Sequence, residues 1–135
     1  MSPKITKHVD QRLRREAVIW LTTVRPDGTP QPTPVWFLWD GETFLIYSKP
    51  NGLKLRNIAN NSKVALSLNC DESGSEVVVI TGDASIDRSP PPTSLQPAYL
   101  RKYRKGIEEI QLTPESMAKE YSVAIWVKPT HIRQD

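Results

Sequence analysis

The chain has 135 residues, 38% of them hydrophobic, and a net charge of +3. This length suits one domain that buries its own core without disulfides or metals. A single cysteine, Cys70, excludes an internal disulfide, and the two distant histidines, His8 and His131, lack the spacing of a zinc site. The small charge is scattered along the chain and does not predict nucleic-acid binding.

Apolar runs are short throughout the sequence. None approaches the roughly 20 residues that span a membrane, and the N-terminus lacks the apolar core of a signal peptide. The single cysteine fits a reducing compartment. We therefore expect a cytoplasmic protein that binds neither membranes nor nucleic acid.

The first part of the chain predicts a short helix and three strands. Residues 6–16 carry Val9 and Leu13 at helical spacing, with Thr6 as the N-cap. Three segments rich in β-branched and aromatic residues follow. They are residues 17–24, 33–39 and 43–48. Turn sequences separate them, so they predict an antiparallel meander.

The second predicted strand is apolar on both faces. Val35, Phe37 and Trp39 share one side, and Trp36 and Leu38 share the other. A sheet with one face in water alternates apolar with polar residues, so the second face must be covered by barrel closure, a helix or another subunit. Three prolines without N–H donors enter this strand and place it at an edge or beside a ligand. They are Pro30, Pro32 and Pro34.

The rest of the chain alternates helices and strands without a βαβ repeat. The helices are predicted at 51–60, where Leu55, Ile58 and Ala59 form the apolar stripe, at 95–110, and from 113 onward, with Thr113 as the N-cap and Pro114 at the first helical position. The strands are predicted at 63–70, at 76–86 with a kink at Gly82, and at 122–133 with an interruption near Pro129. This order argues against a parallel doubly wound sheet. It predicts one mainly antiparallel barrel domain over residues 1–135, with an N-terminal helix in 1–16 and a helical insertion at 93–121.

Residues 47–61 carry the strongest chemical signal. A strand ends in the hydroxyls of Tyr47 and Ser48, and the next helix has Lys54 and Arg56 in its early turns. Helix N-terminal amides, a lysine and an arginine are groups that bind phosphate. Taken alone, the segment fits a solvated basic helix capped by Asn51 slightly better.

Several motifs in order connect the chain to a known family. They are WLTTVRPDG at 20–28, PVWFLWDG at 34–41, FLIYS at 44–48 and KLRNI at 54–58. Over residues 12–133 the chain resembles the pyridoxamine 5'-phosphate oxidase-like split β-barrel proteins, especially the branch that uses the deazaflavin coenzyme F420. The resemblance implies an antiparallel, FMN-binding-type split barrel that forms homodimers with cofactors in clefts between the subunits.

The resemblance also bears on the cofactor. Flavin oxidases of this group carry Tyr-Thr at the strand end and Ser-Arg-Lys at the helix start. Here Tyr47-Ser48 and Lys54 match, whereas Gly52-Leu53 replaces Ser-Arg. The pattern Lys54-x-Arg56-Asn57 is similar to that of the F420-binding relatives. The replacement of Ser-Arg by Gly52-Leu53 is the main reason to favour F420 over FMN.

Four further residues are placed beside the cofactor ring by the resemblance. They are Gln31, Thr33, Val35 and Trp36. An amide and strand backbone suit a pyrimidine-like edge, and Val and Trp suit an apolar ring face. Trp36 fits core or dimer packing equally well, and Gln31 fits a surface position. Tyr121, Trp126 and Arg133 are candidates to reach the partner subunit's cofactor.

The resulting hypothesis is an F420-dependent oxidoreductase. It would transfer a hydride between the deazaflavin and a small unsaturated or quinone-like substrate. Such chemistry needs no protein nucleophile or metal, because the cofactor carries it. Two alternatives remain: an FMN-dependent oxidase or reductase of the same fold, and a non-enzymatic carrier or sensor of a flavin or deazaflavin.

Overall fold

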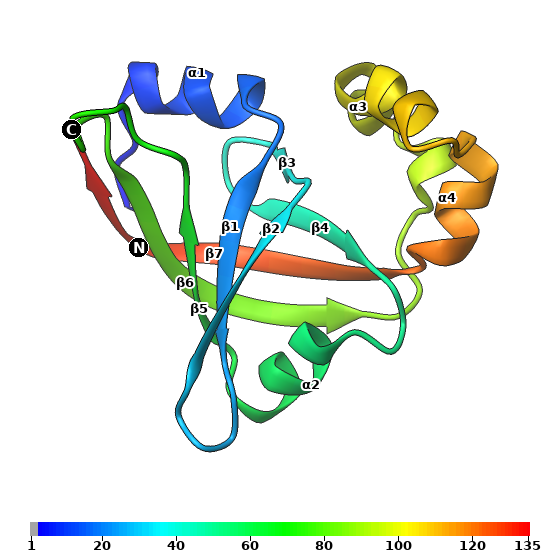
Figure 1. Cartoon of the computed structure of the whole chain (residues 1–135), viewed down its shortest axis with the longest axis horizontal. Coiled ribbons are helices and arrows are strands. Elements are labelled where there is room, and N and C mark those ends of the chain that lie inside the picture. Colours follow the sequence, from blue (N-terminus) through cyan, green and yellow to red (C-terminus); the bar gives the residue numbers. More distant parts are fainter. Residues whose placement is uncertain (1–2) are drawn as a thin grey trace.

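A computed structural model describes residues 3–135 as a curved sheet with helices at its sides (Figure 1). In chain order the elements are α1 (Lys7–Arg15), β1 (Ile19–Val24), β2 (Pro30–Val35), β3 (Leu38–Trp39), β4 (Phe44–Ser48), α2 (Leu53–Asn60), β5 (Lys63–Ser67), β6 (Val78–Asp87), η1 (Thr93–Leu95), α3 (Pro97–Glu109), α4 (Pro114–Glu120) and β7 (Val123–Gln134). The predicted helices and their caps are confirmed at two sites. Thr6 accepts a hydrogen bond from the Val9 amide, and Thr113 forms a capping box with Ser116.

The seven strands form one antiparallel sheet in the order β2-β1-β5-β6-β7-β4-β3. The sheet curls into a half-barrel, and the predicted barrel architecture is therefore confirmed (Figure 1). β6 bends as predicted, with a register shift between Thr81 and Gly82. A Cβ at Gly82 would lie 2.5 Å from the carbonyl oxygen of Lys128, so the two long strands approach closely only because this residue is glycine.

The predicted three-stranded meander is wrong. The expected strand at residues 33–39 is two strands, β2 and β3, which lie at opposite ends of the sheet order. β2 begins earlier, at Pro30, and pairs only with β1. Every second residue from Pro30 to Pro34 is a proline, which has no backbone N–H to donate, and this suits an edge strand. The chain then leaves the sheet at Trp36 and Phe37 and re-enters as β3, which pairs with β4.

Two apolar clusters cover the two faces of the sheet. One fills the half-barrel and includes Phe37 and Trp39 together with Leu13 of α1 and Leu55 of α2. The other packs β4 and β7 against α3 and α4, with Tyr47, Tyr99, Tyr103, Ile107 and Met117 among its members. Trp36 and Leu38 pack against this second cluster. Of the three coverings predicted for that face, helices are the one observed.

Two predictions about α2 are wrong. Ala59 is exposed, whereas Asn57 is buried with Leu55 and Ile58. The N-cap is Gly52, not Asn51, and it makes no side-chain capping bond. Between residues 3 and 135 no helix has the length and apolar character needed to cross a membrane.

Candidate functional site

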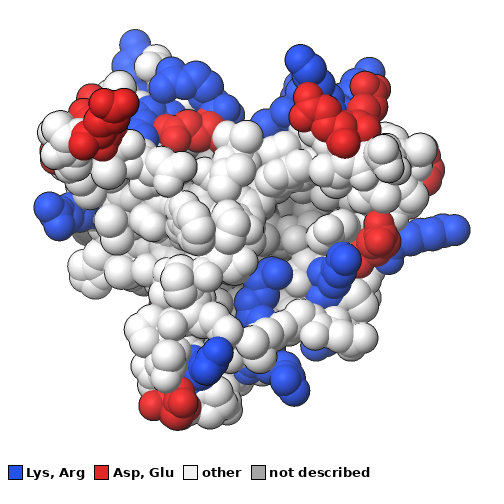
Figure 2. Space-filling model, in the orientation of Figure 1, with Lys and Arg blue, Asp and Glu red and all other residues white. Residues whose placement is uncertain are grey.

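A cavity of about 560 Å³ brings together the end of β2, the start of α2 and the C-terminal ends of α3 and α4. Part of its lining is apolar. These residues are Val18, Pro34, Val35, Trp36 and Ile110. Figure 2 shows this face of the molecule as largely uncharged, with Lys and Arg side chains over the region between α2 and α4.

The remaining lining is polar or aromatic. It consists of Tyr47, Lys49, Gly52, Lys54 and Tyr121. No carboxylate lines the cavity, and neither lysine forms an ion pair among residues 3–135. An apolar wall with a few convergent polar groups is typical of a small-molecule site.

Helix α3 fixes the position of Trp36. The indole stacks on the ring of Tyr103 with centroids 4.6 Å apart and an angle of 6° between the planes. A Cβ on Gly106 would lie 3.2 Å from the indole, so glycine in the middle of α3 makes room for it. The flat wall of the cavity is therefore supported from behind by tightly packed atoms.

Side chains of the same helix hydrogen-bond to the backbone of Phe37, where the strand is interrupted. The Phe37 amide donates to the hydroxyl oxygen of Tyr103 at 2.8 Å, and the Phe37 carbonyl accepts from Lys102 Nζ at 2.8 Å. Burial lowers the pKa of Lys102 to about 8, against the opposing charge of Glu16. Side chains of α3 thus satisfy backbone groups that a continuous strand would have paired within the sheet.

Lys54 lies at the N-terminus of α2. A Cβ on Gly52 would lie 3.2 Å from Ser48 Oγ and 3.8 Å from Lys54 Nζ, so the lysine head lies beside the first turn. Gly52 offers no side-chain cap, which leaves the first two helical amides without a capping acceptor, while the third, at Leu55, donates to the Gly52 carbonyl at 3.1 Å. Burial, and secondarily the charge of Lys49, lowers the pKa of Lys54. A half-buried cation beside free amides can hold an anion.

The two hydroxyls of the predicted grip are already engaged. Tyr47 donates its hydroxyl to the Pro91 carbonyl at 2.6 Å, and Ser48 donates to the Lys49 carbonyl at 2.9 Å. Burial raises the pKa of Tyr47. Ser48 is only 1% exposed. In this arrangement the two lysines of the cavity lining, rather than the engaged hydroxyls, are the available side-chain donors.

Asn57 links three elements instead of lining the cavity. Its Nδ2 donates to Thr23 Oγ1 at 2.9 Å and to Gln31 Oε1 at 2.8 Å. This network joins α2 to the hairpin of β1 and β2, and Asn57 is 1% exposed. Thr33 lies within β2, opposite Leu21 of β1. Among the residues expected around the ring, Gln31 and Thr33 are therefore outside the cavity lining.

Arg56 is separated from Lys54. It lies exposed on α2 and lines a different hollow of about 540 Å³ that includes Pro26, Leu53 and Asn57. The structure thus brings four predicted residues into one cavity. They are Val35, Trp36, Tyr47 and Lys54.

Sequence reasoning missed several residues of this cavity. Lys49 directly follows the predicted hydroxyl pair and was detectable as a second cation in the same loop. Ile110 and Tyr121 had no local signal that placed them there. Tyr121, a candidate to reach the partner subunit's cofactor, lines the cavity of its own chain. Trp126 packs in the helix-covered cluster and approaches Asp87, with Nε1 to Oδ2 at 3.4 Å.

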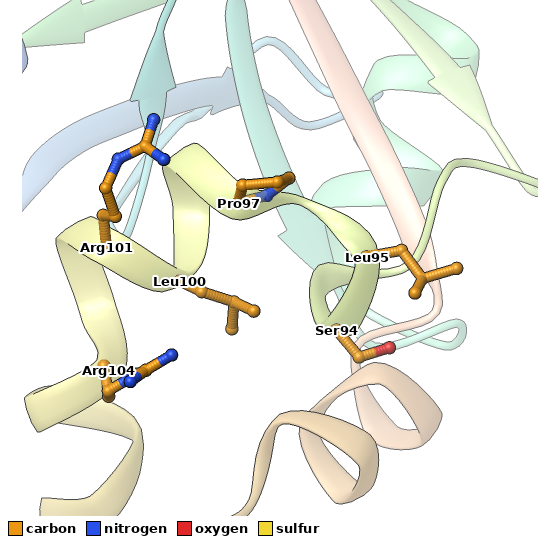
Figure 3. Close-up of a pocket in the computed structure, with 6 residues that line it drawn as sticks. All are labelled: Ser94, Leu95, Pro97, Leu100, Arg101 and Arg104. Atoms are coloured by element: carbon orange, nitrogen blue, oxygen red, sulfur yellow. The ribbon is translucent and has the colours of Figure 1, made fainter.

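A larger hollow of about 660 Å³ lies over η1 and α3 (Figure 3). Leu95, Leu100, Arg101 and Arg104 are among its lining residues. It contains none of the predicted site residues, and no polar group of its lining is buried. We therefore take the cavity beside Lys54 as the candidate site.

Comparisons with known proteins agree with this architecture. The sequence profile of the pyridoxamine 5'-phosphate oxidase family matches residues 5–134. An F420 reductase of known structure is 29% identical, with a TM-score of 0.71, and the match covers 97% of this chain and 100% of that one. No curated protein sequence matches the chain.

More distant structures share the fold alone. A conserved hypothetical protein from Mycobacterium tuberculosis is 18% identical with a TM-score of 0.76, over 96% of this chain and 84% of that one. The heme storage protein HutZ from Vibrio cholerae is 14% identical with a TM-score of 0.65, over 95% of this chain and 93% of that one. The same half-barrel therefore serves proteins with different functions.

Proposed function

Because the chain belongs to the pyridoxamine 5'-phosphate oxidase family, we propose that it is an oxidoreductase that binds coenzyme F420 in the cavity beside Lys54. One observation carries the proposal. A half-buried lysine without a carboxylate partner among the described residues lies beside uncapped helix amides, in a cavity with a flat apolar wall.

The residues present fit a phosphorylated planar cofactor. Lys54 and the first amides of α2 would hold the phosphate, and Gly52 leaves the space that a side chain would fill. Val35 and Trp36 offer an apolar surface for a ring system. The cavity volume of about 560 Å³ falls within the roughly 300–1,000 Å³ typical of ligand sites.

Two features support F420 over FMN. Gly52-Leu53 stands where flavin oxidases of the family carry Ser-Arg, which removes a guanidinium and a hydroxyl from the usual FMN phosphate site. The F420 reductase also matches nearly the whole chain. FMN is the second candidate, since the family as a whole uses flavins and FMN also carries a phosphate.

Bound in this cavity, reduced F420 would supply a hydride to a small unsaturated or quinone-like substrate. The protein's own task would be to bind, orient and exclude water. Trp36, packed against Tyr103 and Gly106 of α3, would keep the ring pocket rigid. Rigid support of this kind favours productive geometry.

We also propose that two copies of the chain form a homodimer with the cofactor cleft at their interface. The exposed edge strand β2 and the neighbouring Trp20, which is 38% exposed on β1, support this proposal. An uncharged sheet face with an exposed aromatic residue is a surface that association would cover. Light scattering of the purified protein measures the oligomeric state. A monomer at micromolar concentration would rule out the homodimer.

The cofactor proposal is tested by titrating the purified protein with F420 and FMN side by side. We expect F420 to bind more tightly, and the Lys54→Gln variant to lose about tenfold or more in affinity, as expected for a charged hydrogen bond. Lys105→Gln, an exposed change on α3, serves as the control. Failure of both cofactors to bind would refute the proposal. Tight FMN binding alone would favour the second candidate, and bound cofactor without turnover of a quinone panel would indicate a carrier or sensor.

A further inference from the structure

Two lysines face the cavity, one from the loop after β4 and one from the first turn of α2, and they reach different parts of it. Lys54 Nζ lies 3.8 Å from the position of a Cβ on Gly52, at the N-terminus of α2. Lys49 Nζ instead lies 5.5 Å from the ring centroid of Tyr121, at the C-terminal end of α4. The second distance is within the range of a cation–π contact. The Tyr121 ring therefore directs Lys49 away from the helix terminus.

The cavity holds two cations and, within the described chain, no anion that balances them. Their mutual repulsion is visible at Lys54, whose pKa burial and the charge of Lys49 both lower. An occupant that brings negative charge to each lysine would relieve this repulsion. The cofactor phosphate assigned to Lys54 accounts for one of these charges.

The surroundings of Lys49 are flat and apolar. Ile110 is 46% exposed although it lines the cavity, and the Tyr121 ring lies close by. Trp36 presents its indole to the same space. A planar apolar body placed here would cover the exposed Ile110 side chain and bring a substituent to the Lys49 ammonium.

We infer that Lys49 and Tyr121 form a substrate subsite, and that the substrate is a planar aromatic molecule bearing a carboxylate or an ionised hydroxyl. The inference rests on the proposed function, because that function assigns the phosphate to Lys54. In it, Lys49 determines specificity and takes no part in holding the cofactor. Tyr121 positions Lys49 and stacks against the substrate ring.

The test compares 2-naphthoate with its neutral analogue 2-naphthamide by isothermal titration calorimetry. Both are titrated into the purified protein, with and without saturating cofactor. We expect the wild type to bind the carboxylate about tenfold more tightly than the amide, the size of one charge-assisted contact. Lys49→Gln should remove this preference while the affinities for the amide and for F420 stay unchanged. Lys119→Gln, an exposed change on α4 outside the cavity lining, should behave as the wild type.

A second pair of variants tests the role of the ring. Tyr121→Phe keeps the aromatic face and should keep the carboxylate preference. Tyr121→Leu removes that face and should reduce the preference severalfold, as expected for loss of a cation–π contact of about 0.5–1 kcal/mol. If the two variants show the same preference for the carboxylate, Tyr121 is not part of the subsite.

Two results would overturn the inference. Lys49→Gln with an intact carboxylate preference would exclude Lys49 from substrate binding. Lys49→Gln with weakened cofactor binding would mean that both lysines hold the cofactor. If neither cofactor binds the wild type, the proposed function fails separately. The inference is then decided on the protein without cofactor, where Lys49→Gln must lose more of the preference than Lys54→Gln.

Discussion

The indole of Trp36 lies parallel to the ring of Tyr103, with centroids 4.6 Å apart. The same tyrosine accepts a hydrogen bond from the Phe37 amide, and its hydroxyl lies 2.6 Å from the Ala17 carbonyl oxygen. One side chain of α3 thus supports the cavity wall and hydrogen-bonds to the backbone where the neighbouring strand is interrupted. Core packing and cavity lining were alternatives for Trp36 in the sequence, and the structure combines them in one residue.

Replacing Gly106 by alanine should weaken cofactor binding severalfold. Alanine stabilises a helix by about 1 kcal/mol relative to glycine. This gain offsets the stability that the protein loses through crowding of the added methyl group. Its Cβ would nonetheless lie 3.2 Å from the indole and shift Trp36 toward the cavity. Titration of F420 and FMN into Gly106→Ala, with Lys105→Ala as the control in the same helix, measures the effect. Unchanged affinity would show that the position of Trp36 does not matter for binding.

Lys102 should make stability depend on pH above neutrality. Burial lowers its pKa to about 8 in the folded protein, below the ordinary value of 10.5. The unfolded chain therefore binds more protons between these values, and stability should rise as pH increases through that window. The side chain is partly exposed, so we expect an effect of about 1 kcal/mol.

Urea unfolding of the wild type and of Lys102→Met at pH 7 and pH 10 measures this effect. The stability of the wild type relative to the variant should increase at the higher pH. Lys105→Met, at an exposed position, should show no such change. A difference that stays constant with pH would contradict the assignment.

Asn57 should prove structural rather than cofactor-binding. Asn57→Ala removes the bonds to Thr23 and Gln31 in a buried position, which should cost about 1–3 kcal/mol of unfolding free energy. Asn60→Ala, exposed on the same helix, should change stability by less than about 0.5 kcal/mol. Chemical denaturation and a cofactor titration separate the two roles. Lost affinity at unchanged stability would place Asn57 in the binding site.

Gly82→Ala should destabilise the half-barrel by about 1–3 kcal/mol or more, because an added Cβ forces backbone movement. It would lie 2.5 Å from the Lys128 carbonyl oxygen, and backbone of the paired strand cannot move aside as a side chain can. Thermal unfolding measures the loss. Gly82→Ala with wild-type stability would show that β6 and β7 tolerate a wider separation.

Local features of the fold follow from neighbouring residues and are readable in the sequence. The Thr6 cap of α1, the Pro114 start of α4 and the bend at Gly82 depend on groups within a few positions or on one missing side chain. The family likewise shows in short ordered motifs. These elements were therefore predicted close to their observed positions.

The site depended on contacts between distant segments. No local pattern shows that Phe37 leaves the sheet, because Lys102 and Tyr103 of α3 make that break favourable. The periodicity of α2 did not separate Lys54 from Arg56, which the helix turns toward different hollows.

By itself, then, the sequence determined the family, the approximate positions of most helices and strands, and the presence of Lys54 at a helix start. Tertiary structure decided which cations share a cavity. Lys49 meets Tyr121 because β7 pairs with β4, with Val123 opposite Ser48, and the Tyr47 hydroxyl is engaged because the Pro91 carbonyl lies next to it. Such pairings depend on the packing of whole elements, and propensities along the chain carry no information about them.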